Sequence, residues 1–376
     1  MISEKDYIEA LDCALKTKKQ YLTSALEMEG QRWLTTIGLD GWSENERKEQ
    51  YEQEVVPYWN RFGLVPKRFW FELNGSRDHH MNPRFLPDDL YYTEILPYMN
   101  NAQQRYGLVN KGYYDYLFSD VKRPKTVVLK IEGIYCDEKR NIIRIEDAIG
   151  RCRERNETLF IKRITNTRFG DGITVFVPME HSDEDIRMIF EKAGPSFIVQ
   201  EKVRQHPLLN RLNPLSACTI RVLSLIMNNE VFIESAMMRI GGQDSLFITD
   251  CDDGINTEIL KDHRLHPKAL INIGKWIENG GGLYDDSFIV PSTEKLYDEV
   301  RRLHPRMSHF KCLGWDFTID EDGDPVFFEF NVAPAIDISQ MVICKPLFNE
   351  RTDWILEDYF ERRTWEQNHR QDILIQ

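Results

Sequence analysis

The chain has 376 residues, enough for two or three domains, and its 41% hydrophobic and 29% charged content is ordinary for a soluble globular protein. A formal net charge of −13 argues against non-specific binding of nucleic acid, because a phosphate backbone attracts clustered positive charge. No apolar run approaches the roughly 20 residues that cross a bilayer, and the first residues lack the basic start and apolar core of a signal peptide.

The cysteines indicate the cellular compartment. They are odd in number, scattered and without a CxxC pair, which favours free thiols in a reducing environment over a disulfide framework. We therefore expect a cytoplasmic protein with neither a nucleic-acid nor a membrane partner. The cysteines are Cys13, Cys136, Cys152, Cys218, Cys251, Cys312 and Cys344.

Residues 1–104 are predicted to form a mainly helical, aromatic-rich N-terminal region. Apolar residues recur at helical intervals from Ile8 to Leu26. Between Val55 and Leu96, aromatic residues gather and prolines repeatedly interrupt regular structure. We expect these aromatics to pack the region onto the rest of the chain. A carbohydrate-stacking surface is the alternative.

Residues 105–204 alternate predicted strands with helices, as in an α+β unit. Lys162 lies near the end of a strand and precedes a loop with Gly170 and Gly172, whose backbone N–H groups could surround phosphate oxygens. A surface lysine before an ordinary turn is the alternative, and the chain has no Walker A motif. The predicted strands are 125–131, 158–164, 173–177 and 196–203, and the helices are 144–155 and 182–193.

Residues 205–376 open with a predicted hairpin that turns at Asn228-Asn229. Arg221 and Arg239 lie on its two strands among apolar neighbours, and each guanidinium must find an anion because it cannot be neutralised. A structural ion pair and a substrate contact both meet that need. Residues 241–263 read as a loop, and helices are predicted at 266–277, 294–303 and 352–363.

A second hairpin, residues 314–331, carries Asp316 on its first strand and Glu329 and Asn331 on its second. Residues two apart on a strand share a face, so Glu329 and Asn331 should point together, while Phe328 and Phe330 point into a packed face. Carboxylate and amide oxygens are ligands that Mg²⁺ accepts. The pattern predicts a magnesium site, and an acidic hairpin that faces water is the alternative.

The order of these features resembles the ATP-grasp superfamily over residues 105–345. Asn110-Lys111-Gly is similar to the family's first nucleotide lysine, although an Asp usually stands where Asn110 does. Lys162 and the loop to Gly172 resemble its second lysine and mobile lid. The run Glu201-Lys202-Val203 resembles the hinge that binds adenine. Asp316, Glu329 and Asn331 resemble the magnesium ligands, and this match is the most specific.

The resemblance implies an α+β ATP-grasp fold, in which subdomains 105–204 and 205–376 clasp ATP beside the helical N-terminal region 1–104. It assigns Lys111, Lys162, Gly170, Gly172 and the hinge residues to nucleotide binding. Arg221 and Arg239 would serve catalysis by stabilising an oxyanion. The implied cofactors are ATP and two Mg²⁺ ions, with Mn²⁺ as an alternative.

Within the superfamily the chain is most similar to the sugar-transfer-associated ATP-grasp proteins, through Gln205-His-Pro and the run from Leu212 to Arg221. This implies a carboxylate–amine ligase that forms an acyl phosphate in polysaccharide or other specialised biosynthesis. The substrates would be a small carboxylate (a sugar acid or amino acid) and an amine, and a homodimer is compatible. The alternatives are a kinase acting on a hydroxyl and a non-catalytic nucleotide- or glycan-binding protein. Residues 241–258 depart from the family's pattern, because the run from Asp244 to Gly254 stands where relatives often carry a glycine-rich substrate loop, so the substrate stays open.

Overall fold

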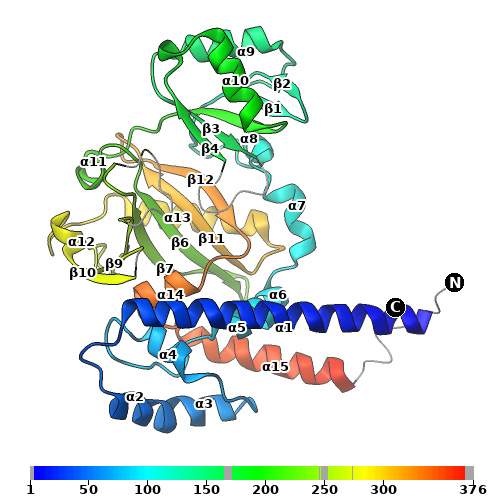
Figure 1. Ribbon diagram of the computed structural model, residues 1–376, viewed down its shortest axis with the longest axis vertical. Coiled ribbons are helices and arrows are strands. Elements are labelled where there is room, and N and C mark those ends of the chain that lie inside the picture. The colour runs from blue at the N-terminus through cyan, green and yellow to red at the C-terminus, as the bar shows by residue number, and fades with distance from the viewer. Residues whose placement is uncertain (1–3, 165–171, 245, 247–252, 273, 369–376) are drawn as a thin grey trace.

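The computed structural model describes residues 4–164, 172–244, 246, 253–272 and 274–368. Figure 1 shows a small sheet with two helices at the top, a larger sheet in the middle and a helical region below it. The α+β fold class is confirmed, as is the mainly helical character of the N-terminal region.

The N-terminal region is a set of helices around a 34-residue helix, α1 (Glu4–Ile37). Two of the helical segments are π-turns, η1 (Tyr51–Val55) and η2 (Tyr91–Ile95). The other helices of this part and of the connection that follows are α2 (Glu44–Gln50), α3 (Val56–Asn60), α4 (Arg68–Asn74), α5 (Asp88–Leu90), α6 (Leu96–Met99), η3 (Ala102–Gln104), α7 (Arg105–Leu108), η4 (Lys111–Tyr113) and α8 (Tyr114–Leu117).

The small sheet is antiparallel, with strand order β2-β1-β5-β3-β4. One face packs on α9 (Ile145–Arg153) and α10 (Asp183–Ala193). Ser182 caps α10 as predicted, because its hydroxyl accepts the N–H of Asp185 at 3.1 Å. The strands are β1 (Thr126–Ile131), β2 (Ile134–Cys136), β3 (Leu159–Arg163), β4 (Ile173–Phe176) and β5 (Phe197–Glu201), and η5 (Pro178–Glu180) precedes α10.

The large sheet is also antiparallel, with order β10-β9-β8-β7-β6-β11-β12. Asn228 and Asn229 both adopt positive φ, which is the geometry that the predicted two-residue turn requires. The strands are β6 (Thr219–Met227), β7 (Glu230–Ile240), β8 (Ile255–Glu258), β9 (Lys268–Ile271), β10 (Lys275–Glu278), β11 (Cys312–Ile319) and β12 (Pro325–Asn331). Its helices are α11 (Pro207–Leu212), α12 (Asn279–Gly282), α13 (Thr293–Leu303), η6 (His304–Met307), α14 (Asp337–Ile343), η7 (Asn349–Arg351) and α15 (Thr352–Asn368).

Two sequence predictions in this half are wrong. The helix expected over residues 266–277 is the hairpin β9–β10, which pairs Leu270 with Trp276. The loop expected over residues 241–263 contains β8, which pairs with β7. In both places the apolar runs are short, and a short run gives no reliable distinction between helix and strand.

The two faces of the large sheet are covered differently. Val222, Trp315 and Phe330 face α13 in one apolar cluster. On the other face, Leu223 and Leu225 share a cluster with Trp59, Trp70 and other aromatics of the N-terminal region, and with α14 and α15. The aromatics therefore pack the N-terminal region onto the sheet, as the composition predicted.

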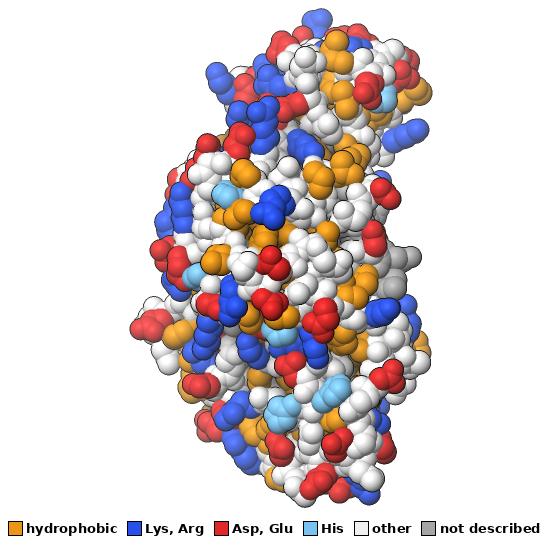
Figure 2. All heavy atoms as spheres, turned by 90° about the vertical axis from the view of Figure 1, so that its left-hand side faces the viewer, with side chains coloured by type: hydrophobic (Ala, Val, Ile, Leu, Met, Phe, Trp, Pro, Cys, Tyr) orange, Lys and Arg blue, Asp and Glu red, His pale blue; other side chains and the backbone are white. Residues whose placement is uncertain are grey.

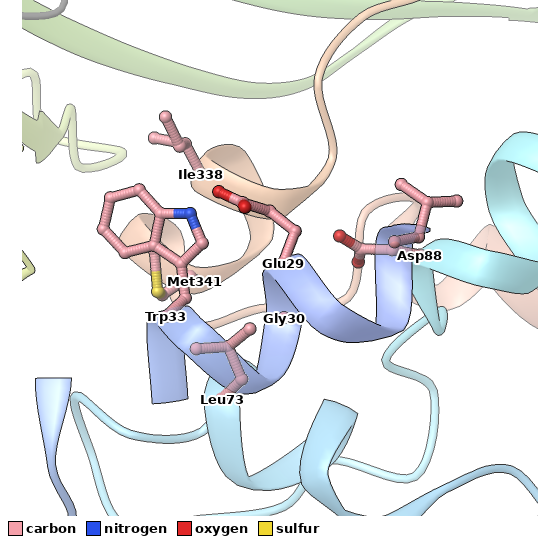
Figure 3. A pocket seen from close by; sticks show the side chains of 8 residues that line it. Glu29, Gly30, Trp33, Leu73, Asp88, Ile338 and Met341 are labelled. Carbon is pink, nitrogen blue, oxygen red and sulfur yellow. The ribbon is translucent and has the colours of Figure 1, made fainter. Parts of the chain in front are cut away.

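The N-terminal helices also pack closely on one another. At Gly30 in α1, a Cβ atom would lie 2.4 Å from the ring of Trp70 in α4. Beside this contact lies a small hollow, lined mainly by apolar side chains of α1, α4 and α14 (Figure 3). The carboxylates of Glu29 and Asp88 lie at its edge.

Candidate active site

A row of charged side chains crosses the large sheet. It lies on the face that the N-terminal region covers farther along the strands, at Leu223 and Leu225. Glu329 pairs with Asp316 across β12 and β11, and Asp316 pairs with Arg221 on β6. Directly paired residues share a face of the sheet, so these three side chains lie together. Along β6 the same face continues through Leu223 and Leu225. The row therefore lies where this face changes from polar to apolar.

A β-bulge in β12 alters the expected orientation of Phe328. Asp316 pairs with Glu329 but Phe317 pairs with Phe327, so Phe328 is the extra residue. Phe330 lies in the packed cluster as predicted, whereas Phe328 is only half-buried and contacts the small sheet. The Nζ of Lys162 lies 5.2 Å from the centre of its ring. The prediction that both phenylalanines face the core is thus wrong for Phe328.

Lys111 bridges the two sheets. Its Nζ lies 2.7 Å from Oε2 of Glu329 on β12, and its backbone N–H donates to the carbonyl of Ile164 after β3 at 3.1 Å. The side chain of Asn110 accepts the N–H of Gly112 at 2.8 Å and starts the turn that presents the lysine. Asn110, where the family usually has Asp, therefore keeps a capping function.

Asp316 is 5% exposed and binds Arg221 through both carboxylate oxygens, the Nη2–Oδ2 distance being 2.8 Å. The amide of Asn331 lies 3.4 Å from the same Oδ2. Two carboxylates and an amide on one face of a hairpin supply the hard oxygen donors that Mg²⁺ prefers, so these residues fit a magnesium site. That role remains a prediction.

Electrostatics in this row depend on the facing lysines. Burial and the nearby charge of Lys111 lower the pKa of Lys162 to about 8. Burial would raise the pKa of Glu329, but Lys111, Arg221 and Lys162 outweigh it and hold that pKa below its usual range. Among the described residues, no carboxylate lies within ion-pair distance of Lys162. Glu329 is the carboxylate that the structure places against Lys111, and its charge also acts on Lys162.

Arg123 was missed by the sequence analysis. It lies between α8 and β1, its side chain is 7% exposed, and it contributes to lowering the pKa of Lys162. Its Nη1 donates to Asp115 at 2.9 Å, and its guanidinium lies over the ring of Tyr114. The basic run Lys122-Arg-Pro-Lys125 at the start of a predicted strand was the available signal.

The other predicted site residues are spread more widely. Arg239 on β7 pairs with Thr219 on β6 and is half-buried on the same face as Arg221. Glu201 alternates with Gln200 on β5, so its side chain points to the face opposite Lys162, where it binds Arg155 at 2.8 Å. Lys202 and Val203 follow the end of β5. Gly172 adopts φ +80°, and Gly170 and the rest of the predicted lid, residues 165–171, lie outside the described residues.

The turn of the same hairpin brings together Asp320, Asp322 and Asp324, whose carboxylate oxygens lie within 4.8 Å of one another. Lys122 occupies the centre of this group, with its Nζ 3.0 Å from Asp324 and 3.5 Å from Asp322. The amine already supplies the charge that a cation would bring, so we assign this cluster a structural role in the turn.

A family comparison covers the hairpin that carries the predicted metal ligands. Residues 280–354 match the model of the sugar-transfer associated ATP-grasp family. The ATP-grasp resemblance is confirmed. The matched segment is about a fifth of the chain and includes β11, β12 and α14, hence Asp316, Glu329 and Asn331 of the ATP-grasp resemblance.

Several solved structures align with the chain at low identity. D-alanyl-alanine synthetase A from Vibrio cholerae shares 14% identity over 66% of this chain with a TM-score of 0.39, and VanG D-Ala:D-Ser ligase from Enterococcus faecalis shares 15% over 67% with 0.40. The chain spans 61% of the length of each of these ligases. A Campylobacter jejuni biotin carboxylase shares 10% over 71% of this chain and 47% of its own, with a TM-score of 0.42.

Further comparisons complete the description. No curated protein matches the sequence. No helix in the described part of the chain has the length and apolar character needed to cross a membrane. The six cysteines in that part are free thiols, and Cys251 lies outside it. On the surface shown in Figure 2, acidic and basic side chains are interspersed.

Proposed function

We propose that the protein is an ATP-dependent ligase that joins a small carboxylate to an amine. The observation that carries the proposal is that Lys111 and Lys162 approach β12 from the small-sheet side, Lys111 at Glu329 and Lys162 at Phe328. Glu329 in turn lies in a row with Asp316 and Arg221. Subdomains 105–204 and 205–376 would hold ATP between them, with the lid over the phosphates.

Charge balance supports this arrangement. Each carboxylate of the row now contacts a cation, Glu329 through Lys111 and Asp316 through Arg221. ATP with two Mg²⁺ ions adds about zero net charge. The phosphates could therefore replace the carboxylates as partners of Lys111 and Arg221, while the metal ions replace those cations as partners of Glu329 and Asp316. Asp316, Glu329 and Asn331 would hold the Mg²⁺ ions, whose positive charge would offset the charge that develops on the phosphates. Lys111, Lys162 and Arg123 would orient the triphosphate.

The proposed reaction has two steps. A carboxylate oxygen of the substrate attacks the γ-phosphorus, the bond to the β-phosphate oxygen breaks, and ADP leaves an acyl phosphate. The amine nitrogen then attacks the acyl carbon, the carbon–oxygen bond breaks, and phosphate and a proton leave as the amide forms. Arg221 or Arg239 on the same face would stabilise the oxyanion of that second step.

The family description supports a substrate from sugar chemistry. Its printed name associates the matched segment with sugar transfer. We therefore propose a sugar acid or an amino acid as the carboxylate, in cytoplasmic polysaccharide or other specialised biosynthesis. The predicted homodimer would be checked by light scattering of the purified chain.

The test measures ADP release with Mg-ATP and pools of sugar acids and amino acids, supplied with amines. Asp316→Asn and Glu329→Gln should each lower the rate by at least about a hundredfold, because they remove charge at the metal and phosphates. Asp322→Asn is the matched control, since its side chain is 74% exposed in the turn of the same hairpin. ADP release that survives both site variants contradicts the proposal. Product mass then separates an amide from the phosphate ester of a kinase.

A further inference from the structure

Asn100 of the N-terminal region lies between the two strands that carry the proposed metal ligands. It is 3% exposed, and its Nδ2 donates to the carbonyls of Cys312 at 2.6 Å and Val332 at 2.7 Å. Its Oδ1 accepts the N–H of Cys312 at 3.1 Å. Cys312 begins β11, and Val332 directly follows Asn331 at the end of β12.

These contacts extend the hairpin beyond its last backbone pair. The pairing of β11 with β12 ends at Gly314 and Asn331. An asparagine amide offers two donors and an acceptor, so a single side chain can bind both strand ends. A backbone carbonyl away from water that loses its hydrogen-bond partner destabilises the structure around it. Asn100 therefore sets the separation of the strands at the position where Asn331 leaves the sheet.

Two tyrosines of η2 hold the segment that follows. The hydroxyl of Tyr91 donates to the carbonyl of Pro334 at 3.2 Å, and the hydroxyl of Tyr92 accepts the N–H of Ile336 at 3.2 Å. Pro334 in turn rests against Gly314, where a Cβ atom would lie 3.0 Å from the proline. Residues 332–336 are thus bound by the N-terminal region along their length. The π-turn geometry of η2 is of a kind that often occurs at functional sites.

We infer that Asn100 is a positioning residue for the proposed magnesium site, acting through the strand ends around Asn331. The inference rests on the proposed function, and it makes the N-terminal region part of the site. Groups that orient a metal ligand without touching the metal commonly affect metal affinity strongly. Asn100 meets that description, because it binds the residue next to Asn331 and never the proposed ion.

The test is calorimetric binding of ADP to the full-length protein, with and without Mg²⁺. The quantity of interest is the affinity for ADP with Mg²⁺ divided by the affinity for ADP without Mg²⁺. Asn100→Ala should lower that ratio by about tenfold and leave Mg-free ADP affinity within about twofold, because only metal geometry is disturbed. Tyr58→Phe is the control, since it removes a 2.7 Å hydrogen bond from the N-terminal region to Asp353 of α15, away from the site. Its ratio should equal that of the wild type.

Asn100→Ala removes a buried polar side chain, so circular dichroism must first show that it folds. Should it not fold, Tyr92→Phe decides, since it removes one hydroxyl and should lower the ratio by about threefold. An unchanged ratio in the folded variant, or an equal loss with and without Mg²⁺, overturns the inference while the proposed function stands. A wild-type protein that binds ADP without any response to Mg²⁺ refutes the proposed function itself.

Discussion

At the scale of single residues, the proposed site consists of charges that already have partners, with one exception. Glu329 and Asp316 are each neutralised by a cation, whereas Lys162 contacts the ring of Phe328 and has no carboxylate within reach among the described residues. A half-buried ammonium in that setting releases its proton more easily than an exposed one. Its protonation should therefore control binding of an anionic ligand.

The affinity for Mg-ADP should fall as pH rises from 7 to 9. Because burial and Lys111 lower the pKa of Lys162 to about 8, its charge is largely present at pH 7 and largely lost at pH 9. If only the protonated form binds, the loss is about tenfold. Calorimetry across this range checks it. Lys162→Arg should bind with little pH dependence over the same range, since arginine stays charged; an equally steep profile in that variant would assign the effect to another group.

His304 should make folding stability sensitive to acid. It is fully buried, its Nδ1 lies 2.7 Å from the hydroxyl of Ser224, and burial lowers its pKa from 6.5 to about 4. Between those values the unfolded chain takes up a proton that the folded chain does not. Stability is therefore complete above about pH 6.5 and falls by up to about 3 kcal/mol as pH drops toward 4.

Urea denaturation at pH 7.5 and 5 measures this effect. Between pH 7.5 and 5, His304→Gln should lose less stability than the wild type. Its free energy of unfolding at pH 7.5 should already be lower than that of the wild type. His309→Gln, at an exposed position a few residues later, should follow the wild type. If both variants lose as much stability between pH 7.5 and 5 as the wild type does, the acid sensitivity arises from another group.

At the scale of elements, local signals predicted what local chemistry determines. The turn at Asn228-Asn229 and the cap at Ser182 could be predicted from the sequence, because a few adjacent residues determine each of them. The hairpin β9–β10 is predicted wrongly as a helix. Gly274, which adopts φ +82° in its turn, was the residue in the sequence that could have indicated a hairpin. The bulge at Phe328 could not be predicted, because register depends on the partner strand.

Two helical glycines should respond in opposite directions to the same change. Gly30→Ala would force a methyl group to within 2.4 Å of Trp70, so we expect a net loss of about 1–3 kcal/mol from overpacking. Gly150→Ala in α9 meets no atom within 4 Å and should gain up to about 1 kcal/mol from helix propensity. Thermal and urea denaturation of both variants test this, and a stabilised Gly30→Ala would show that α1 does not pack as described.

At the scale of the whole molecule, the N-terminal region is joined to the site-bearing sheet by both apolar and ionic contacts. Arg77 and Glu258 of β8 are 3% and 4% exposed in their side chains and lie 2.9 Å apart. Arg77 also donates to the carbonyl of Val342 in α14. Composition predicted an aromatic region that packs onto the rest. The composition could not predict which face of the large sheet the N-terminal region covers, because those contacts join residues far apart in sequence.

Arg77→Met should destabilise the protein by about 3 kcal/mol, because Lys345 would be the one cationic partner left to Glu258 in the described part of the chain. The double variant with Glu258→Gln should lose less than the sum of the single variants. Arg301→Met, which removes an ion pair exposed at the surface of α13, should change stability by less than about 0.5 kcal/mol. Urea denaturation gives all four values; strict additivity in the double variant would show that the buried pair is not coupled.

The separate apolar clusters have a consequence for how the molecule opens. The small sheet has its own core with α9 and α10, whereas the N-terminal helices and the large sheet share one. Regions with a common core lose amide protection together, and regions with separate cores can exchange independently. Hydrogen exchange should therefore reveal two cooperative units. The lysine strand β3 would belong to one and the carboxylate strands β11 and β12 to the other, so that local opening of the small sheet alone would release a nucleotide.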